Sequence, residues 1–247
     1  MAQDRYYQRF STVETNSTFY NLPRLPTAER WRQESPQDFV FCVKAWQLIT
    51  HPRSSPTYER LKTRMSEKEL SRCGHFKSSA EVMSAWERTQ EIARVLKARF
   101  VLFQTPASFY PNADHLRDMY RFFKGLKREG VSLVWEPRGE SWEPAMVSKI
   151  CADLSLIHGV DPMIAEPMRG AVRYYRLHGR HERGKIVYGH EYSDAELRHI
   201  LSRCEGHSAY VYFNNVSMWR DAERFDGLVH PENQRQRLGY VRHLRTF

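Results

Sequence analysis

Short apolar runs alternate with longer stretches of helical period along the chain. The runs are rich in β-branched and aromatic residues and are bounded by polar or turn residues, which predicts strands. Strands this apolar, separated by helices, are typical of parallel βα units. We therefore expect an α/β protein with strands at residues 11–14, 39–44, 100–104, 131–136, 156–161, 172–178 and 209–214.

The stretches between these runs predict amphipathic helices. In the clearest one, residues 78–98, Ser79 is expected to cap the first turn. Residues 57–77 are charged and carry no strand signal, so we expect a helical excursion there that could serve as an arm or lid. No Gly/Ser-rich linker divides the chain, which predicts one domain over residues 1–247. Further helices are expected at 114–127, 144–154 and 194–204.

Two architectures suit such a pattern, a (β/α) barrel and a doubly wound sheet. A dinucleotide-binding sheet would carry G-x-G-x-x-G after an early strand, and a phosphate loop would carry G-x-x-x-x-G-K-[ST]; the sequence has neither. We therefore predict a TIM-barrel-like (β/α) barrel. Seven predicted strands are one short of the usual eight, and residues 1–10 have the pattern of the end of a helix. We therefore expect a barrel that is open or lacks its first strand.

Most of the predicted strands end on polar side chains. The C-terminal ends of parallel barrel strands gather on one face, which carries the active site in characterised barrels. Alternation along the strand puts Glu136 on the side of Val134, and Arg176 on the side of Tyr174 and His178. A single polar strand end is normally just solvated, but this many predict a shared site: Glu14, Asn16, Lys44, Gln104, Glu136, Arg138, Arg176, His178, Asn214 and Asn215.

These residue types favour an anionic ligand. The loop after the 172–178 strand, HGRHERGKIVYGH, contains Arg180 and further basic residues and is a candidate phosphate site. A basic loop that is simply exposed to solvent would have the same composition. Glu136 or His178 could serve as general acid or base, with Glu14 as a third catalytic candidate. Equally, Glu136 could simply compensate the charge of a neighbouring arginine.

Cofactors and disulfides are not expected. A metal ion could be ligated by Glu14, Glu136, Asp161 and His178. The cations at the same mouth, Lys44, Arg138 and Arg176, disfavour one. The four cysteines are widely spaced with no C-x-x-C pair, which predicts reduced thiols and a cytoplasmic protein, and no segment is apolar enough to predict a membrane span.

A formal net charge of +9 favours anionic partners. We consider three functions. The first is binding of a phosphate-bearing ligand, such as nucleic acid or a nucleotide, with possible phosphoester hydrolysis. The second is an enzyme acting on a small sugar or sugar phosphate, with Glu136 and His178 as acid and base. The third is a non-catalytic basic adaptor.

Six ordered segments, VETNSTFYNLP, FVFCVKAWQLITH, VLFQTPASF, WEPRGESW, YYRLHGR and YVYFNN, resemble the motifs of the YecE-like family, domain of unknown function family 72. The resemblance implies a TIM-barrel-like fold but no settled reaction. The usual opening G-T-S-G-W strand of that family is absent, which agrees with the strand count. The resemblance also implies a mouth built from Glu14, Asn16, Lys44, His51, Gln104, Glu136, Arg138, Arg176, His178 and Asn214.

Overall fold

The structure is a computed structural model that describes residues 3–167, 170–182 and 185–231. Contacts within the chain divide it into two compact units. The first comprises residues 1–159 and 167–170, and the second comprises residues 160–166 and 171–247. That residues 1–247 form one domain stays a prediction.

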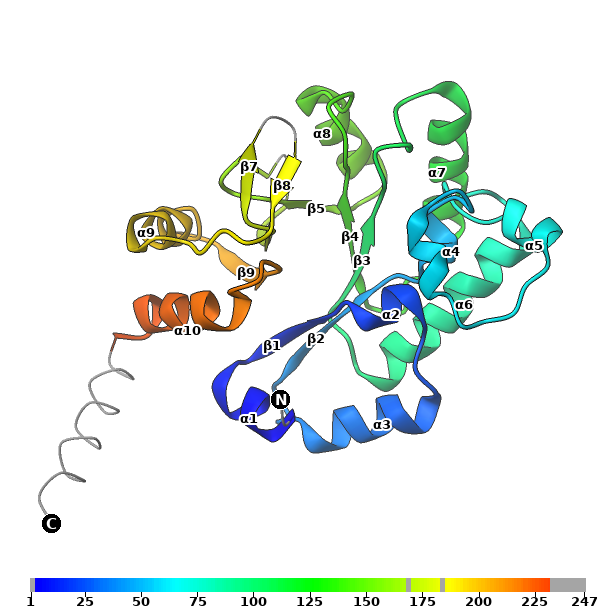
Figure 1. Ribbon diagram of the computed structural model, residues 1–247. Helices are drawn as coiled ribbons and strands as arrows, with labels where there is room; N and C mark the ends of the chain where they lie inside the picture. The colour runs from blue at the N-terminus through cyan, green and yellow to red at the C-terminus, as the bar shows by residue number, and fades with distance from the viewer. Residues whose placement is uncertain (1–2, 168–169, 183–184, 232–247) are drawn as a thin grey trace, which may run out of the picture. The chain divides into compact units, whose positions relative to one another are not determined.

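Parallel strands and the helices between them build the first unit (Figure 1). Five strands pair in chain order, each parallel to the next: β1 Thr12–Thr15, β2 Val40–Lys44, β3 Phe100–Gln104, β4 Ser132–Glu136 and β5 Ile157–Val160. The helices of this unit's βα repeats are α1 Gln3–Arg9, α2 Ser17–Tyr20, α3 Leu25–Glu34, α4 Gln47–Thr50, α6 Ala80–Val95, α7 Ala113–Gly125 and α8 Pro144–Asp153.

These strands have two different faces, because successive side chains point to opposite sides. One face packs against the helices in a single buried cluster that includes Trp86 of α6, Phe122 of α7 and Ile150 of α8. The opposite face carries the polar strand ends described below. The strand residues in the helix-packed cluster are Phe41, Val43, Val101, Phe103, Leu133 and Trp135.

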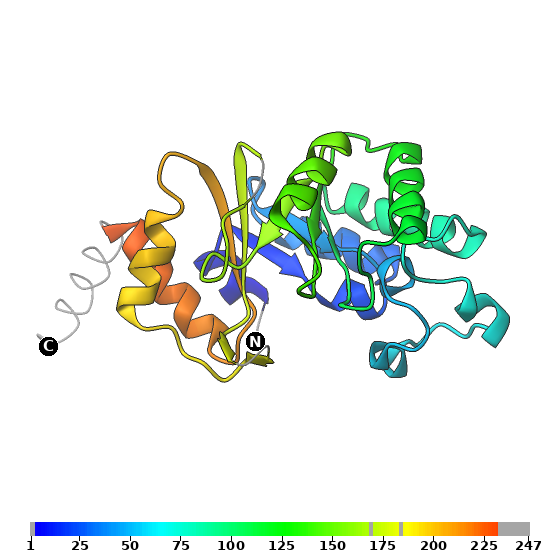
Figure 2. The ribbon, with the colours of Figure 1, turned by 90° about the horizontal axis from the view of Figure 1, so that it is seen from above.

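An excursion of residues 51–77 leaves the first unit between α4 and α6 and projects beyond its strands (Figure 2). It contains a 3-10 turn, η1 Pro56–Arg60, and a short helix, α5 Glu67–Ser71. Its return is tied down where Gly74 N–H donates to the Leu48 carbonyl at 2.7 Å. Gly74 is needed there, because φ is +83° and a Cβ would lie 2.4 Å from the His51 carbonyl oxygen. The predicted helical excursion at 57–77 falls within this segment.

In the second unit, β6 Val172–Leu177 pairs in parallel with β9 Ser208–Phe213. Helices α9 Asp194–Ser202 and α10 Met218–Val229 pack beside this pair (Figure 1) and bury Leu177, Leu197, Ile200 and Phe225 with it. An antiparallel hairpin, β7 Arg180–Glu182 and β8 Lys185–Val187, follows β6.

The alternation of helices with strands in parallel pairing confirms the predicted α/β class and the TIM-barrel-like fold. Each predicted strand lies within two residues of an observed one, and Ser79 caps α6 by accepting from Val82 N–H at 3.2 Å. Within the described residues a helix precedes β1, as expected. The β7–β8 hairpin stands where a basic loop was expected, and α3 and α10 were not predicted. No helix of the described chain has the length and apolar character needed to cross a bilayer.

Candidate functional site

Four of the predicted side chains share one face of the first unit's strands. Glu14 stands beside Cys42 in the β1–β2 register, and Lys44 lies two residues further along β2 on the same side. Gln104 and Glu136 are register partners at the ends of β3 and β4. Because their neighbours in sequence, such as Phe103 and Trp135, pack on the helices, these polar ends lie on the opposite face.

Lys44 is held at the end of β2 by contacts on two sides. Its Nζ donates to Gln104 Oε1 at 3.0 Å and lies 4.4 Å from the centre of the Phe19 ring. The Thr18 hydroxyl donates to the Lys44 carbonyl at 2.7 Å, which fixes the backbone there. With 9% of its surface exposed, Lys44 is a fixed charge rather than a mobile surface lysine.

Glu136 forms an ion pair with Arg138 just beyond β4. The distance from Glu136 Oε1 to Arg138 Nη2 is 2.7 Å, and the Glu136 side chain is nine-tenths buried. Space beside it depends on Gly159 of β5, where a Cβ would lie 3.0 Å from Val134 Cγ1 and 3.4 Å from Glu136 Cβ. Val134 and Glu136 lie on the same side of β4, as the alternation of side chains along the strand predicts.

His51 follows α4 and lies next to the same group. Its ring packs edge-on to Phe19 with centroids 4.7 Å apart, and Nδ1 is 2.8 Å from the Thr50 hydroxyl. Burial, with help from the charge of Lys44, lowers the pKa of His51 to about 3. The imidazole is therefore neutral near pH 7 and leaves Lys44 as the cation on this side of the group.

His158 in β5 is a buried titratable residue that sequence reasoning missed. It is the register partner of Trp135 and so lies on the helix-packed face. Burial lowers the pKa of His158 to about 4, against a smaller opposite effect of Glu136. A histidine among apolar strand residues is typical of a core position, and no pattern of charged neighbours in the sequence indicates that it is titratable and buried.

In the second unit, Arg176 and His178 lie together at the end of β6. Arg176 Nη1 is 3.3 Å from His178 Nε2, and the two side chains are 1% and 5% exposed. Leu177 between them packs with α9 and α10, so Arg176 lies on the other face, as predicted. The guanidinium of Arg176 keeps its charge even when buried, since the pKa of a guanidinium is ordinarily above about 12.

Asn215 belongs to a buried polar network that α10 completes. Its Nδ2 donates to Asp221 Oδ2 at 2.6 Å and to the His190 carbonyl at 2.8 Å. Asp221, fully buried, also accepts from Arg224 Nη1 at 3.2 Å. The amide nitrogen of Asn215 therefore ties the loop after β9 to α10; whether this residue also contacts a ligand stays a prediction.

The remaining predicted residues lie at varied places. Arg180 opens the β7–β8 hairpin, is exposed, and pairs with Glu182 at 2.6 Å. Asn214 follows β9, where its backbone N–H donates to the Leu177 carbonyl at 2.7 Å. Asn16 stands at the N-cap position of α2. Arg183 of the predicted basic loop lies outside the described residues.

The structure thus brings six candidates together in the first unit: Glu14, Lys44, His51, Gln104, Glu136 and Arg138. A second group, Arg176 and His178, forms in the second unit. Across the part of the chain that the structure describes, no three His, Cys, Asp or Glu side chains group as a metal site would require. None of the four cysteines, all of which lie in the described residues, forms a disulfide.

Comparison with known proteins gives consistent matches. A sequence model of the family described as "Protein of unknown function DUF72" matches residues 4–242. The chain is 22% identical to the UPF0759 protein YunF of Bacillus subtilis, over 86% of this chain and 79% of that protein.

Solved structures show the same fold. A DUF72 family protein of Enterococcus faecalis superposes with a TM-score of 0.67 at 19% identity, covering 93% of each chain. A xylose isomerase domain containing protein of Salmonella typhimurium gives 0.58 at 10% identity, covering 93% of this chain and 91% of that one. At these identities the likeness establishes the fold alone.

Proposed function

This chain belongs to the DUF72 family of proteins of unknown function, and from its own strand ends we propose that it binds a small phosphate-bearing ligand and hydrolyses a phosphoester in it. The proposed binding group is the set on the first unit's polar face, with Lys44 and Arg138 as cations and Gln104 as an amide. Glu136 is the proposed general base.

The observation that carries the proposal is that two contacts, Lys44 with Gln104 and Arg138 with Glu136, lie at paired strand ends, because Gln104 and Glu136 are register partners. Two cations and an amide lie beside Glu136 on a strand-end face that also carries Glu14. Phosphate oxygens accept hydrogen bonds from such cations, and an arginine can meet two of them at once. A carboxylate in the same group could take the proton of an attacking water.

Burial favours a small ligand over nucleic acid. Lys44 and Glu136 are each less than one-tenth exposed, so the backbone of a duplex, which requires surface cations, would not reach them. A nucleotide or a sugar phosphate can enter a narrower site. The net charge of +9 then contributes attraction over a distance rather than contacts.

In the proposed reaction, water attacks phosphorus and the ester P–O bond breaks. Glu136 accepts one proton of the water, and the departing alkoxide takes a proton from solvent to leave as the alcohol, after which Glu136 returns its proton to solvent. Lys44 and Arg138 stabilise the negative charge on the phosphoryl oxygens. In the second unit, Arg176 and His178 stay the predicted anion-binding and acid–base pair of the β6 end.

A non-catalytic adaptor is the second candidate, and two ion pairs favour it. Arg138 pairs with Glu136 at 2.7 Å and Arg180 pairs with Glu182 at 2.6 Å, so both arginines already have a neighbouring carboxylate. Such pairs would keep the charges compensated without any substrate. The xylose isomerase domain in the description of the Salmonella protein is no evidence for a sugar substrate of this chain, because a likeness at 10% identity supports the fold alone.

The test is a screen of the full chain against nucleotides, sugar phosphates and nitrophenyl phosphate esters, with binding followed by calorimetry and turnover by product release. On any active substrate, Glu136→Gln should lower kcat by about 100-fold or more. Glu140→Gln, an exposed acid nearby, is the matched control and should retain full activity. Lys44→Gln should weaken binding of the same ligand.

Three results would overturn the proposal. No binding and no turnover across the panel would favour the adaptor, as would binding that Lys44→Gln leaves unchanged. Binding of mixed oligonucleotides with a steep salt dependence, and no small ligand, would instead favour nucleic acid as the partner.

A further inference from the structure

Beyond this proposed function, we propose that the excursion between α4 and α6 carries a second binding site, for an organic anion with an apolar body such as an aliphatic or aromatic carboxylate. The site is an open hollow of about 760 Å³, and the residues that line it all come from one stretch of the chain, residues 53–70. Cavities that hold small organic ligands typically measure about 300–1,000 Å³. None of the strand-end residues above lines this cavity.

The apolar part of the cavity is anchored to the body of the first unit. Tyr58, Leu61 and Met65 line it and are partly buried against the helix-packed cluster. The Tyr58 hydroxyl donates to the His51 carbonyl at 2.9 Å, which holds the ring in place. An apolar ligand body would therefore meet a fixed surface rather than a loose loop.

Cations surround this apolar surface. Lys62 and Arg64 line the cavity, are exposed, and take part in no ion pair among the residues that the structure describes. Arg53 also lines it and is held by Glu67, with Nη2 2.7 Å from Oε1. Glu59 is the acid in the lining. This balance favours an anionic head group over a neutral or cationic one.

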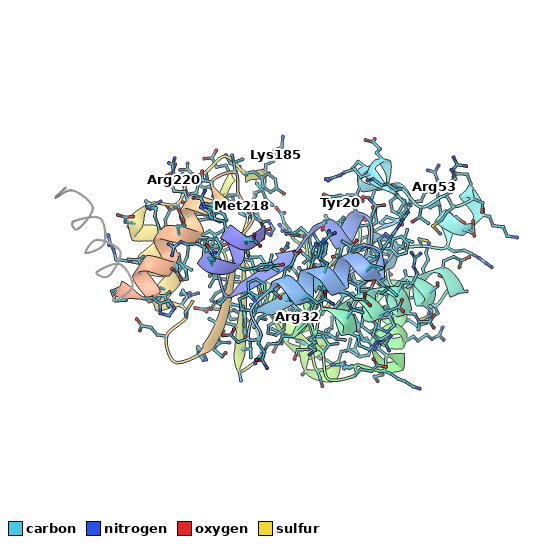
Figure 3. The ribbon with its side chains drawn as sticks, turned by 90° about the horizontal axis from the view of Figure 1, so that it is seen from below. Tyr20, Arg32, Arg53, Lys185, Met218 and Arg220 are labelled. Carbon is cyan, nitrogen blue, oxygen red and sulfur yellow. The ribbon has the colours of Figure 1, made fainter. Side chains whose placement is uncertain are left out.

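The excursion is also locally well constructed. α5 begins with a capping box in which Ser66 and Glu69 satisfy each other's backbone N–H groups. Its return is fixed by the bonds of Gly74 to Leu48 and of Phe76 N–H to the Ile49 carbonyl at 2.9 Å. Arg53 stands at the start of this segment and is labelled in Figure 3. A hollow with an anchored apolar side, and with cations at Lys62 and Arg64 that form no ion pair among the described residues, is an arrangement that suits an anionic ligand.

The test uses anilinonaphthalene sulfonate, a fluorescent aromatic anion, titrated into the folded full chain. The double variant Lys62→Gln/Arg64→Gln should bind the probe about five- to tenfold more weakly than the wild type, since two exposed charge contacts are removed. Lys68→Gln/Arg121→Gln removes the same charge at exposed positions outside the cavity and should bind as the wild type does. Decanoate should displace the probe, whereas decanol and inorganic phosphate should not.

Equal affinity of the cavity variant and the control variant would overturn the inference, as would absence of probe binding to the wild type. Displacement of the probe by decanol as effectively as by decanoate would also overturn it, because the cations would then contribute nothing to binding of the head group. Glu136→Gln should leave probe binding unchanged, so failure of this site and failure of the strand-end site are separate results.

Discussion

Lowering the pH from about 7.5 to about 5 should cost the folded protein about 4 kcal/mol through His51 and His158. Burial, and for His51 the nearby Lys44 charge, lowers their pKa values from 6.5 to about 3 and about 4. Both imidazoles therefore stay neutral in the folded protein at pH 5, whereas in the unfolded chain they bind protons. Their contribution to stability is complete above pH 6.5 and is lost as the pH falls from there towards 4.

The magnitude follows from the distance between the experimental pH and the unfolded pKa. At about pH 5 each histidine lies about 1.5 units below its unfolded pKa, and one unit corresponds to about 1.4 kcal/mol, so each costs about 2 kcal/mol. The carboxylates also titrate in this range, so the absolute change for the wild type mixes several groups. The difference between wild type and a histidine variant isolates the term.

The assay is urea unfolding followed by tryptophan fluorescence at the two pH values. His51→Gln and His158→Gln should each reduce the loss of unfolding free energy between the two pH values by about 2 kcal/mol, and the double variant by about 4 kcal/mol. His199→Gln, an exposed histidine of α9, should not reproduce this change. A double variant that loses as much stability as the wild type would refute the reasoning.

Three further changes test how the fold holds its sites. Gly74→Ala would place a Cβ 2.4 Å from the His51 carbonyl oxygen at a φ of +83°, and it should cost about 1–3 kcal/mol and speed proteolysis of the excursion. Ser79→Ala removes the N-cap of α6 and should lower the unfolding free energy by about 1 kcal/mol, with Ser79→Asp retaining it. Asp221→Ala removes a fully buried acceptor and should cost about 3–5 kcal/mol in urea unfolding; a smaller loss than Ser79→Ala would contradict the buried network.

The strands and their faces were predictable because the signal is local. Because side chains alternate along a strand, Glu136 and Trp135 were expected on opposite faces of the sheet, and so were Lys44 and Val43. The cap of α6 was predictable for the same reason: Ser79 precedes a helical pattern directly. Helix α10 was missed because its acidic and basic residues obscure the apolar positions that Phe225 represents.

Most partners of side chains could not be predicted, since they depend on how the backbone turns after each strand; pairing of Glu136 with an arginine was expected only as an alternative to a catalytic role. Arg138 reaches back to Glu136, and Arg180 meets Glu182 across one residue of a hairpin strand. Asn215 finds Asp221, which lies in a helix the sequence pattern did not reveal. These contacts are decided by tertiary structure, so residue type and spacing alone left them open.

The most direct test of the proposed phosphate site is a crystal structure of the full chain soaked with inorganic phosphate. The account predicts phosphate oxygens within hydrogen-bonding distance of Lys44 Nζ and the Arg138 guanidinium, beside Glu136 on the first unit's polar face. Phosphate bound at exposed arginines, with the Lys44–Gln104 and Glu136–Arg138 contacts unchanged and no ion between them, would contradict it.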